Sequence, residues 1–235
     1  MASASKAIDD AFAHLNDLLL RPIDPTISAF DTEINKSILA SAMAIINAIK
    51  LLIQASIASQ EEIVNNGKGS NSKTSFYKKN NKWTEGLISA SKSIAYSTNI
   101  LIKIADGVLS GKNTNEELIV ASNEVAASTA QLVSSSRVKS QYMSKTQDNL
   151  ESASKKVNLA CKQLVAKVNE LISNKNELAE VDYSKLSIHE NKTVEMEQQV
   201  EILKLENALI AARKRLGEIR KFSYRDDDDD DDDDN

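Results

Sequence analysis

Two segments of this chain, GLISASKSIAYSTNILI at residues 86–102 and ELIVASNEVAASTAQLV at residues 117–133, are copies of one pattern. They align without a gap at an offset of 31 residues and share 8 of 17 positions. In the first copy Leu87, Ile94 and Leu101 recur every seven residues, which places them on one stripe of a helix. Only small polar residues separate them on that stripe, so such helices can pack closely side by side. The repeat therefore predicts an all-α bundle of long helices.

The composition favours helices over other elements. Aromatic residues make up 4% of the 235 residues, and there are six glycines and two prolines, a balance typical of long helices. The formal charge is −5, but nine of the 34 acidic residues form the run 226–234, which leaves 29 basic residues against 25 acidic ones. The rest of the chain is therefore mildly basic, which points only weakly to an acidic partner. We expect no nucleic acid among its partners.

The single cysteine and the amino terminus favour a soluble cytoplasmic protein. Cys161 cannot form an intramolecular disulfide, so a reducing compartment is the simpler assumption, and its helical context predicts a core position. The start MASASK is not a signal peptide, and no apolar run is expected to approach a membrane span of about 20 residues.

Apolar spacing and turn residues divide the chain into six predicted helices. The polar segment between the second and third is expected to carry Phe76 and Tyr77 as anchors, and Trp83 to anchor the head of the third helix. Capping-box patterns, Thr114-x-x-Glu117 and Ser144-x-x-Gln147, predict the starts of the fourth and fifth. The helices are expected over residues 3–20, about 27–66, 83–107, 114 to about 140, about 145–180, and 188–222.

These elements group into four predicted regions. Residues 1–25 form a first amphipathic helix and a linker with two prolines, and residues 26–182 form the core of the bundle. Residues 188–222 form a last helix whose seam follows the 3-4-3-4-3 spacing of a coiled coil, and residues 223–235 form a disordered aspartate tail. The apolar face of the first helix is Ile8, Phe12, Leu15 and Leu19. The seam of the last helix is Ile202, Leu205, Leu209, Ala212, Leu216 and Ile219.

No motif in the chain predicts catalysis or metal binding. His14 and His189 lie outside the repeat and lack zinc-ligand spacing, and Gly67-Lys68-Gly69-Ser70 lacks the spacing of a phosphate-binding loop. The carboxylates read as helix surface or capping residues. We therefore expect no enzyme, no cofactor and no metal.

Four blocks of the chain resemble one known module. These are WTEGLISASK at 83–92, ELIVAS at 117–122, VAASTAQLV at 125–133 and RLGEIRK at 215–221. They resemble the I/LWEQ module, also called the talin, huntingtin-interacting-protein and Sla actin-tethering domain, and look more like its endocytic-adaptor branch than like talin. The block near Gln147 departs from the pattern, because aligning Leu150 puts Glu151 where the module has glutamine. The lipid-binding and clathrin-binding segments of those adaptors are not in these residues, so neither property is carried over.

The resemblance implies a function and a set of residues for it. It implies a five-helix bundle that binds filamentous actin at the cytoplasmic cortex, an upstream helix that restrains binding, and a carboxy-terminal helix that forms a homodimer. The module's basic-valine-basic triplet corresponds to Arg137, Val138 and Lys139. Further candidate actin contacts on the fifth helix are Lys155, Lys156 and Lys162.

Each of these assignments has a plainer alternative. The triplet could be ordinary last-turn cations favoured by the helix dipole, and the other lysines could be ordinary surface residues. The last helix could fold back on the bundle, and the first could merely cover an apolar strip. As a whole, the chain could instead be a helical scaffold for a partner helix, or a peripheral membrane binder that uses its basic faces.

Overall fold

The computed structural model describes residues 2–20, 29–177 and 188–223. These residues form seven helices and no strand, which confirms the all-α fold. The proline linker, the polar joint at 182–187 and the aspartate run 226–234 lie outside the described residues. The chain divides into two compact units, Met1–Leu178 and Ala179–Asn235. The helices are α1 (Ala2–Leu20), α2 (Ala29–Gly67), α3 (Lys73–Lys79), α4 (Asn81–Leu109), α5 (Asn115–Arg137), α6 (Lys145–Glu177) and α7 (Ile188–Ser223).

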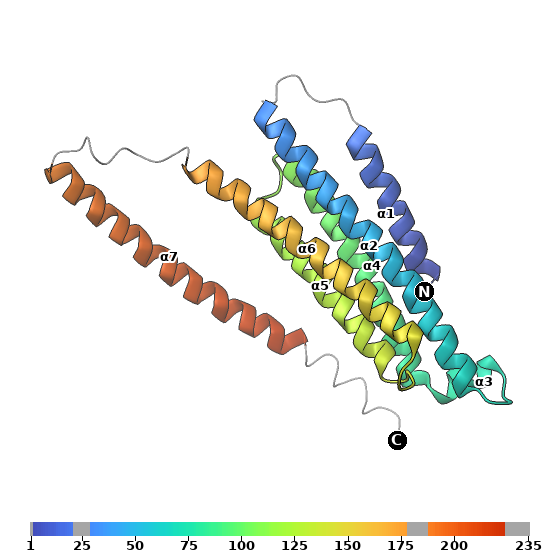
Figure 1. Cartoon of the computed structure of the whole chain (residues 1–235). Helices are drawn as coiled ribbons and strands as arrows, with labels where there is room; N and C mark the ends of the chain where they lie inside the picture. Colours follow the sequence, from blue (N-terminus) through green and yellow to red (C-terminus); the bar gives the residue numbers. More distant parts are fainter. Residues whose placement is uncertain (1, 21–28, 178–187, 224–235) are drawn as a thin grey trace. The chain divides into compact units, whose positions relative to one another are not determined.

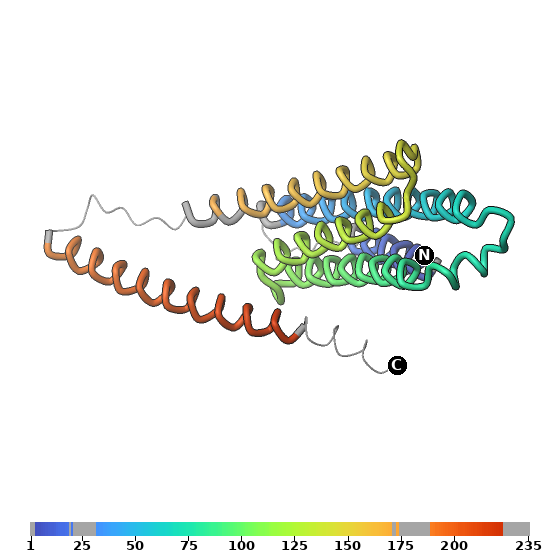
Figure 2. The backbone as a smooth tube through the Cα atoms, turned by 90° about the horizontal axis from the view of Figure 1, so that it is seen from below, coloured from blue at the N-terminus to red at the C-terminus, as the bar shows by residue number. Residues whose placement is uncertain are grey.

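The first unit is a five-helix bundle, as predicted. Helices α1, α2, α4, α5 and α6 run alongside one another (Figure 1), and the short α3 lies at one end. Helix α2 contacts each of the other four long helices, whereas α1 packs on α2 and α4. Helix α6 packs on both α2 and α5, and Figure 2 shows α2 alongside α6. The first helix therefore lies in the same compact unit as the core predicted over residues 26–182.

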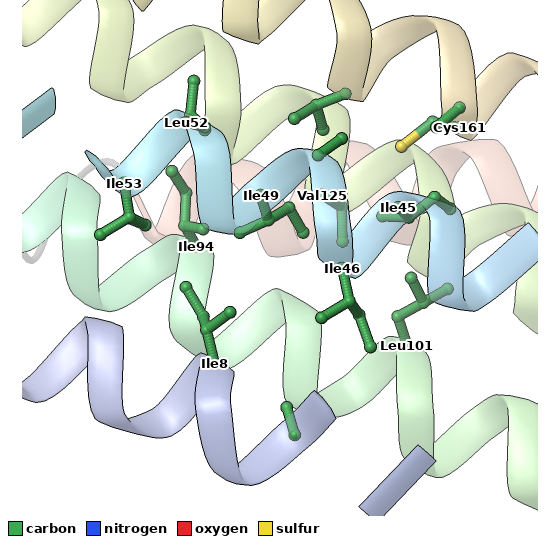
Figure 3. Close-up of a cluster of buried hydrophobic side chains, with 14 of the residues drawn as sticks. Ile8, Ile45, Ile46, Ile49, Leu52, Ile53, Ile94, Leu101, Val125 and Cys161 are labelled. Atoms are coloured by element: carbon green, nitrogen blue, oxygen red, sulfur yellow. The ribbon is translucent and has the colours of Figure 1, made fainter. Parts of the chain in front are cut away.

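The core is built from the stripes that the repeat predicted. Leu87, Ile94 and Leu101 in α4, and the equivalent Leu118, Val125 and Leu132 in α5, are all at most 2% exposed. The two copies also meet directly, because the hydroxyls of Ser97 and Ser128, which occupy equivalent positions, are 2.9 Å apart. Figure 3 shows Ile8 of α1, Ile94 of α4 and the isoleucines of α2 converging on one cluster.

Helix α2 corrects the prediction that no apolar run approaches the length of a membrane span. Between Thr32 and Gly67 it is long and apolar enough to cross a membrane by length and composition alone, because Ala and Ser interrupt the apolar runs without making them polar. In the bundle, half of its most apolar window is buried, and Ile38, Ile45, Ile49 and Leu52 are fully enclosed by neighbouring helices. This burial is what a central core helix requires.

The helix boundaries follow local capping. Thr114 caps α5: its Oγ1 accepts the backbone N–H of Glu117 at 3.3 Å, and the Glu117 carboxylate accepts the Thr114 N–H at 2.9 Å. This confirms the first predicted capping box. In the second predicted capping box, Ser144 Oγ accepts the Gln147 N–H at 3.1 Å. The Gln147 side chain instead bonds to Ser136 inside the protein.

The segment between α2 and α4 contains an element that was not predicted. Residues Lys73–Lys79 form α3, which begins where Ser72 Oγ accepts the Ser75 N–H at 3.2 Å. The segment is too short and polar to show helical periodicity in the sequence. It folds because Phe76 is buried against the bundle, which confirms the anchor role predicted for that residue.

The second unit contains α7, a 36-residue helix. Its described side chains are exposed along its length, apart from the half-buried Val194. The exposed residues include large apolar ones, among them Leu205, Leu209 and Leu216. The last helix is therefore formed as predicted, and its pairing stays a prediction.

Candidate functional site

The basic triplet lies where α5 ends. Arg137 is the last residue of the helix, Val138 is its C-cap, and Lys139 begins the connection to α6. All three side chains are exposed, and Val138 is 73% exposed although it is apolar. The preceding residue, Ser136, is 1% exposed. The helix end thus holds one side chain inward and directs the next three outward.

A chain of hydrogen bonds connects Arg137 to the core. Its Nε and Nη2 donate to Glu151 Oε1 of α6 at 3.1 and 2.6 Å, and Gln147 Nε2 donates to the same oxygen at 3.2 Å. Gln147 Oε1 accepts from the buried hydroxyl of Ser136 at 3.0 Å, and that hydroxyl lies 2.9 Å from the hydroxyl of Ser59 in α2. The network joins three helices and orients the guanidinium on the surface.

The carboxylates around this network favour their ionised forms. Hydrogen bonds from Arg137 and Gln147, together with the positive charge of Arg137, lower the pKa of Glu151. In α2, hydrogen bonds from Thr146 and Ser144 lower the pKa of Glu62, and Thr146 Oγ1 lies 2.7 Å from Glu62 Oε2. These two carboxylates tie the start of α6 to α5 and α2.

An aromatic cluster of Phe76, Tyr77 and Trp83 packs at the same end of the bundle. Trp83 is 8% exposed and its Nε1 donates to the carbonyl oxygen of Ser135 at 2.9 Å, in the last turn of α5. Its ring meets that of Phe76 edge to face, with centroids 6.0 Å apart. Tyr77 packs on Phe76 and accepts a hydrogen bond from Gln60. Trp83 is thus a bundle-end anchor, as predicted, and it supports the helix turn that carries Arg137.

Two adjoining hollows border the triplet and are lined by cations. One, of about 600 Å³, lies beside Val138 and Trp83 at the start of α4, and the other, of about 340 Å³, lies beside α3. Lys79 and Lys139 line both. Lys82 adds a further cation to the first hollow and Lys68 adds one to the second. No acidic residue is among the described lining residues of either hollow. The surface near the triplet therefore suits an acidic partner.

The turn between α5 and α6 carries two exposed apolar residues that the sequence analysis did not select. Tyr142 is 94% exposed and Met143 is 80% exposed. Their signal in the sequence was two large apolar residues inside a predicted break, where polar residues are usual. The pairing of Glu151 with Arg137 spans 14 residues and a helix break, so it leaves no local signal in the sequence.

The three candidate lysines of α6 lie at different distances from the triplet along the helix. Lys155 is one turn beyond Glu151 and contributes to the low pKa of that carboxyl group. Lys162, seven residues further on, lines an open groove between α5 and α6 together with Asn123 and Asn158. Lys156 is exposed. The structure thus groups Lys155 with the triplet and places Lys162 about 10 Å farther along the helix axis.

The predicted face of the first helix is partly as expected. Ile8 and Leu15 are at most 2% exposed, and Phe12 is half-buried with Lys50 Nζ 4.3 Å from its ring centroid. Leu18, 5% exposed, is a buried residue outside the predicted face, and the side chain of Leu19 lies outside the described residues. The seam residues of α7 belong to the second unit and are exposed there.

Cys161 is a core residue, as predicted. It is 2% exposed, and burial raises the pKa of its thiol. Ser122 Oγ donates to the Cys161 carbonyl oxygen at 3.3 Å. Among the described residues, no group of three His, Cys, Asp or Glu side chains lies close enough to hold a metal ion.

Comparison with known proteins identifies the family. The I/LWEQ domain model matches residues 77–225. The chain is 49% identical over 224 residues to Endocytosis protein end4 of Schizosaccharomyces pombe and 41% identical over 231 residues to Huntingtin-interacting protein 1 of Homo sapiens. Each alignment covers 95% of this chain, and 20% and 22% of those proteins, so the chain spans about a fifth of their length. It is 35% identical to Talin-B of Dictyostelium discoideum, over 96% of this chain and 9% of that protein. The chain is more similar to end4 and to Huntingtin-interacting protein 1 than to this talin, and it belongs to the I/LWEQ domain family.

Proposed function

We propose that this chain is a filamentous-actin-binding module that tethers another structure to the actin cytoskeleton. This function requires neither catalysis nor a cofactor. A protein with this function acts in the cytoplasm, at the actin cortex. Family membership supports it, because the I/LWEQ resemblance implies actin binding. The name of the end4 relative also connects that protein with endocytosis.

The observation that carries the proposal is the exposed triplet at the end of α5. Val138 is an apolar side chain 73% exposed between two cations, and the hydrogen-bond network and Trp83 hold that helix end in a defined orientation. Lysines line both neighbouring hollows. Exposed cations beside an exposed apolar group suit an acidic protein surface, on which charge sets the encounter rate and the apolar contact adds stability.

We assign Arg137, Val138, Lys139 and Lys155 to the centre of the filament-binding surface. Lys156 and Lys162 extend it along α6. The Arg137–Glu151 pair and the neighbouring position of Lys155 support this grouping.

Helix α1 restrains binding in this proposal. It packs on α2 and α4, so it can detach while the network joining α2, α5 and α6 stays intact. Its attachment combines buried apolar residues with an ion pair between Asp9 and Lys50, 2.8 Å long. A helix attached along one side of a bundle can shift the equilibrium between two arrangements without a change in the rest of the fold.

Helix α7 forms a homodimer through its seam. The seam residues are exposed within the second unit, and their 3-4-3-4-3 spacing is that of a helix that pairs with another helix. Two linked actin-binding bodies would bind one filament with a gain in avidity on the order of 10²-fold or more.

Two binding assays test the function. Co-sedimentation with actin filaments and flotation with acidic phospholipid vesicles are measured for the same preparation of the full chain. We expect saturable pelleting with filaments that weakens from low to physiological salt, because the contact is largely electrostatic. Binding to vesicles alone would support a peripheral membrane role, and binding to neither would favour a scaffold for a partner helix.

A further inference from the structure

The turn that connects α5 to α6 exposes apolar surface at its tip. Tyr142 and Met143, at 94% and 80% exposed, are the two most exposed large apolar side chains of the described residues. They follow Lys139 closely in the sequence, and Val138 is exposed on the same connection. The tip therefore continues the surface formed by the basic triplet.

Hydrogen bonds hold this tip in a defined shape. The backbone N–H of Ser144 donates to the carbonyl oxygen of Gln141 at 3.3 Å, which closes a turn with Tyr142 and Met143 at its two central positions. On one side of the turn, Asn66 of α2 donates to the Gln141 side chain at 3.3 Å. On the other, Ser144 is 8% exposed and caps α6. Both ends are attached to helices by hydrogen bonds, and the two central apolar side chains are exposed.

Met143 has an unfavourable backbone conformation. Its φ is +59°, and among the described residues it is the only residue other than glycine with a positive φ. Turns with a left-handed third residue strongly prefer glycine or asparagine at that position. A methionine there strains the backbone, and its exposed side chain gains little from burial within this chain. Such residues are common at binding and catalytic sites, where the side chain serves an external contact.

The charges around the tip indicate what it contacts. Residues 137–147 contain three cations, Arg137, Lys139 and Lys145, and no acidic residue. An apolar tip among cations fits an acidic protein surface with an apolar recess. A membrane offers similar chemistry, but membrane binding by apolar residues usually relies on the long face of an amphipathic helix rather than on two side chains of a rigid turn.

We propose that Tyr142 and Met143 are the apolar contact residues of the filament-binding surface and insert into a recess on the filament beside the acidic groups that meet the triplet. The inference rests on the proposed actin binding and adds to it a part of the surface that the triplet does not include. Tyrosine is enriched among the residues that contribute most to protein interfaces, and methionine adapts to irregular apolar recesses.

The test uses the full chain with Tyr142→Ser and Met143→Gly together. The matched control is Tyr96→Ser with Val120→Ser, which removes two side chains that are 68% and 67% exposed on α4 and α5. Filament co-sedimentation should show at least a tenfold loss of affinity for the turn variant and less than a twofold change for the control. The melting temperature of the turn variant should equal or exceed that of the unmodified chain, because glycine relieves the strain at position 143.

Four outcomes would overturn the proposal. Unchanged filament affinity of the turn variant, while Arg137→Asp, Val138→Asp, Lys139→Asp abolishes binding, would limit the contact to the triplet and leave the proposed function intact. A lower melting temperature of the turn variant would show that the two residues serve the fold. If the turn variant keeps its filament affinity and loses only binding to acidic vesicles, the turn contacts a membrane and this proposal fails while the actin-binding function stands. If the unmodified chain fails to pellet with filaments, both this proposal and the actin-binding function fail.

Discussion

At the scale of single residues, buried hydrogen bonds at the end of α5 fix the direction of the exposed side chains next to them. Ser136 and the carbonyl of Ser135 are fixed by Gln147 and Trp83, on the inner side of the helix. The outward residues Arg137 and Val138 are therefore held in one direction relative to α6. A binding surface with little freedom of its own loses less entropy when it meets a partner.

Glu151 limits the charge that Arg137 presents. The two side chains are 29% and 64% exposed, so their ion pair contributes little to stability, and its main effect is on the local charge. Glu151→Gln should raise filament affinity about two- to fivefold at low salt, since one nearby unit charge at an exposed site is worth about 0.5–1 kcal/mol. The gain should disappear at high salt.

The control for this change is Glu170→Gln, which removes the carboxylate of another ion pair on α6, with Lys167. Titration of both variants and the unmodified chain against actin filaments at two salt concentrations gives the comparison. Weaker binding by Glu151→Gln would mean that the carboxylate is needed to orient Arg137. An equal gain in both variants would mean that only net charge matters.

At the scale of elements, the two terminal helices have opposite environments. Helix α1 buries Ile8, Leu15 and Leu18 in the core, whereas the described side chains of α7 are almost all exposed within its own unit. The 3-4-3-4-3 spacing of the exposed seam is typical of a helix that pairs with another helix, as proposed. The two helices therefore lead to different predictions.

The seam of α7 is tested by Leu209→Asp with Leu216→Asp. Charges at these positions would be buried in a paired helix, so the variant should be monomeric while the body stays folded. The matched control, Leu203→Asp with Ile210→Asp, has the same spacing of seven residues on another face of the helix and should remain a dimer. Light scattering at micromolar concentration gives the mass. A monomeric mass for the unmodified chain would contradict the proposed homodimer.

The restraint by α1 is tested by deleting residues 1–25. The melting temperature should fall, because the deletion removes the packing of three large buried side chains, each worth about 1.5–3 kcal/mol before entropy is subtracted, and exposes the apolar surface that α1 covers. Filament affinity should rise about tenfold if the docked helix disfavours the binding arrangement by about 1.4 kcal/mol.

A second variant keeps this test decisive if the truncated chain aggregates. Ile8→Asp with Leu15→Asp should displace α1 while leaving it attached to the chain. Circular dichroism and melting curves show whether the body stays folded in either form. Unchanged or weaker filament binding by a folded variant would mean that α1 only covers an apolar strip.

Much of this architecture could be predicted from the sequence, for identifiable reasons. Seven-residue spacing of large apolar residues located α4 and α5, and the Thr114 box located the start of α5, because both signals are local. Helix α3 was missed, because its stability depends on burying Phe76 rather than on periodicity. The contacts of Arg137 with Glu151 and of Trp83 with Ser135 depend on how distant segments pack, which a single sequence does not encode visibly.

At the scale of the whole molecule, the chain has two units: the helical bundle of Met1–Leu178, called the body, and the unit of Ala179–Asn235, which contains one described helix. The body carries the triplet, the network and the apolar turn at one end of the bundle, and the second unit carries the seam of α7. This division would let filament binding and pairing be altered independently.

The central claim is that the triplet at the end of α5 binds actin filaments. Its most direct test is co-sedimentation of the full chain carrying Arg137→Asp, Val138→Asp and Lys139→Asp at near-physiological salt. The matched control is Lys92→Asp, Lys103→Asp and Val120→Asp, which makes the same change in charge at three exposed positions of α4 and α5. With helical content unchanged in both, we expect the triplet variant to remain in the supernatant and the control to pellet like the unmodified chain. Full pelleting of the triplet variant, or equal loss of binding in the control, would contradict the assignment.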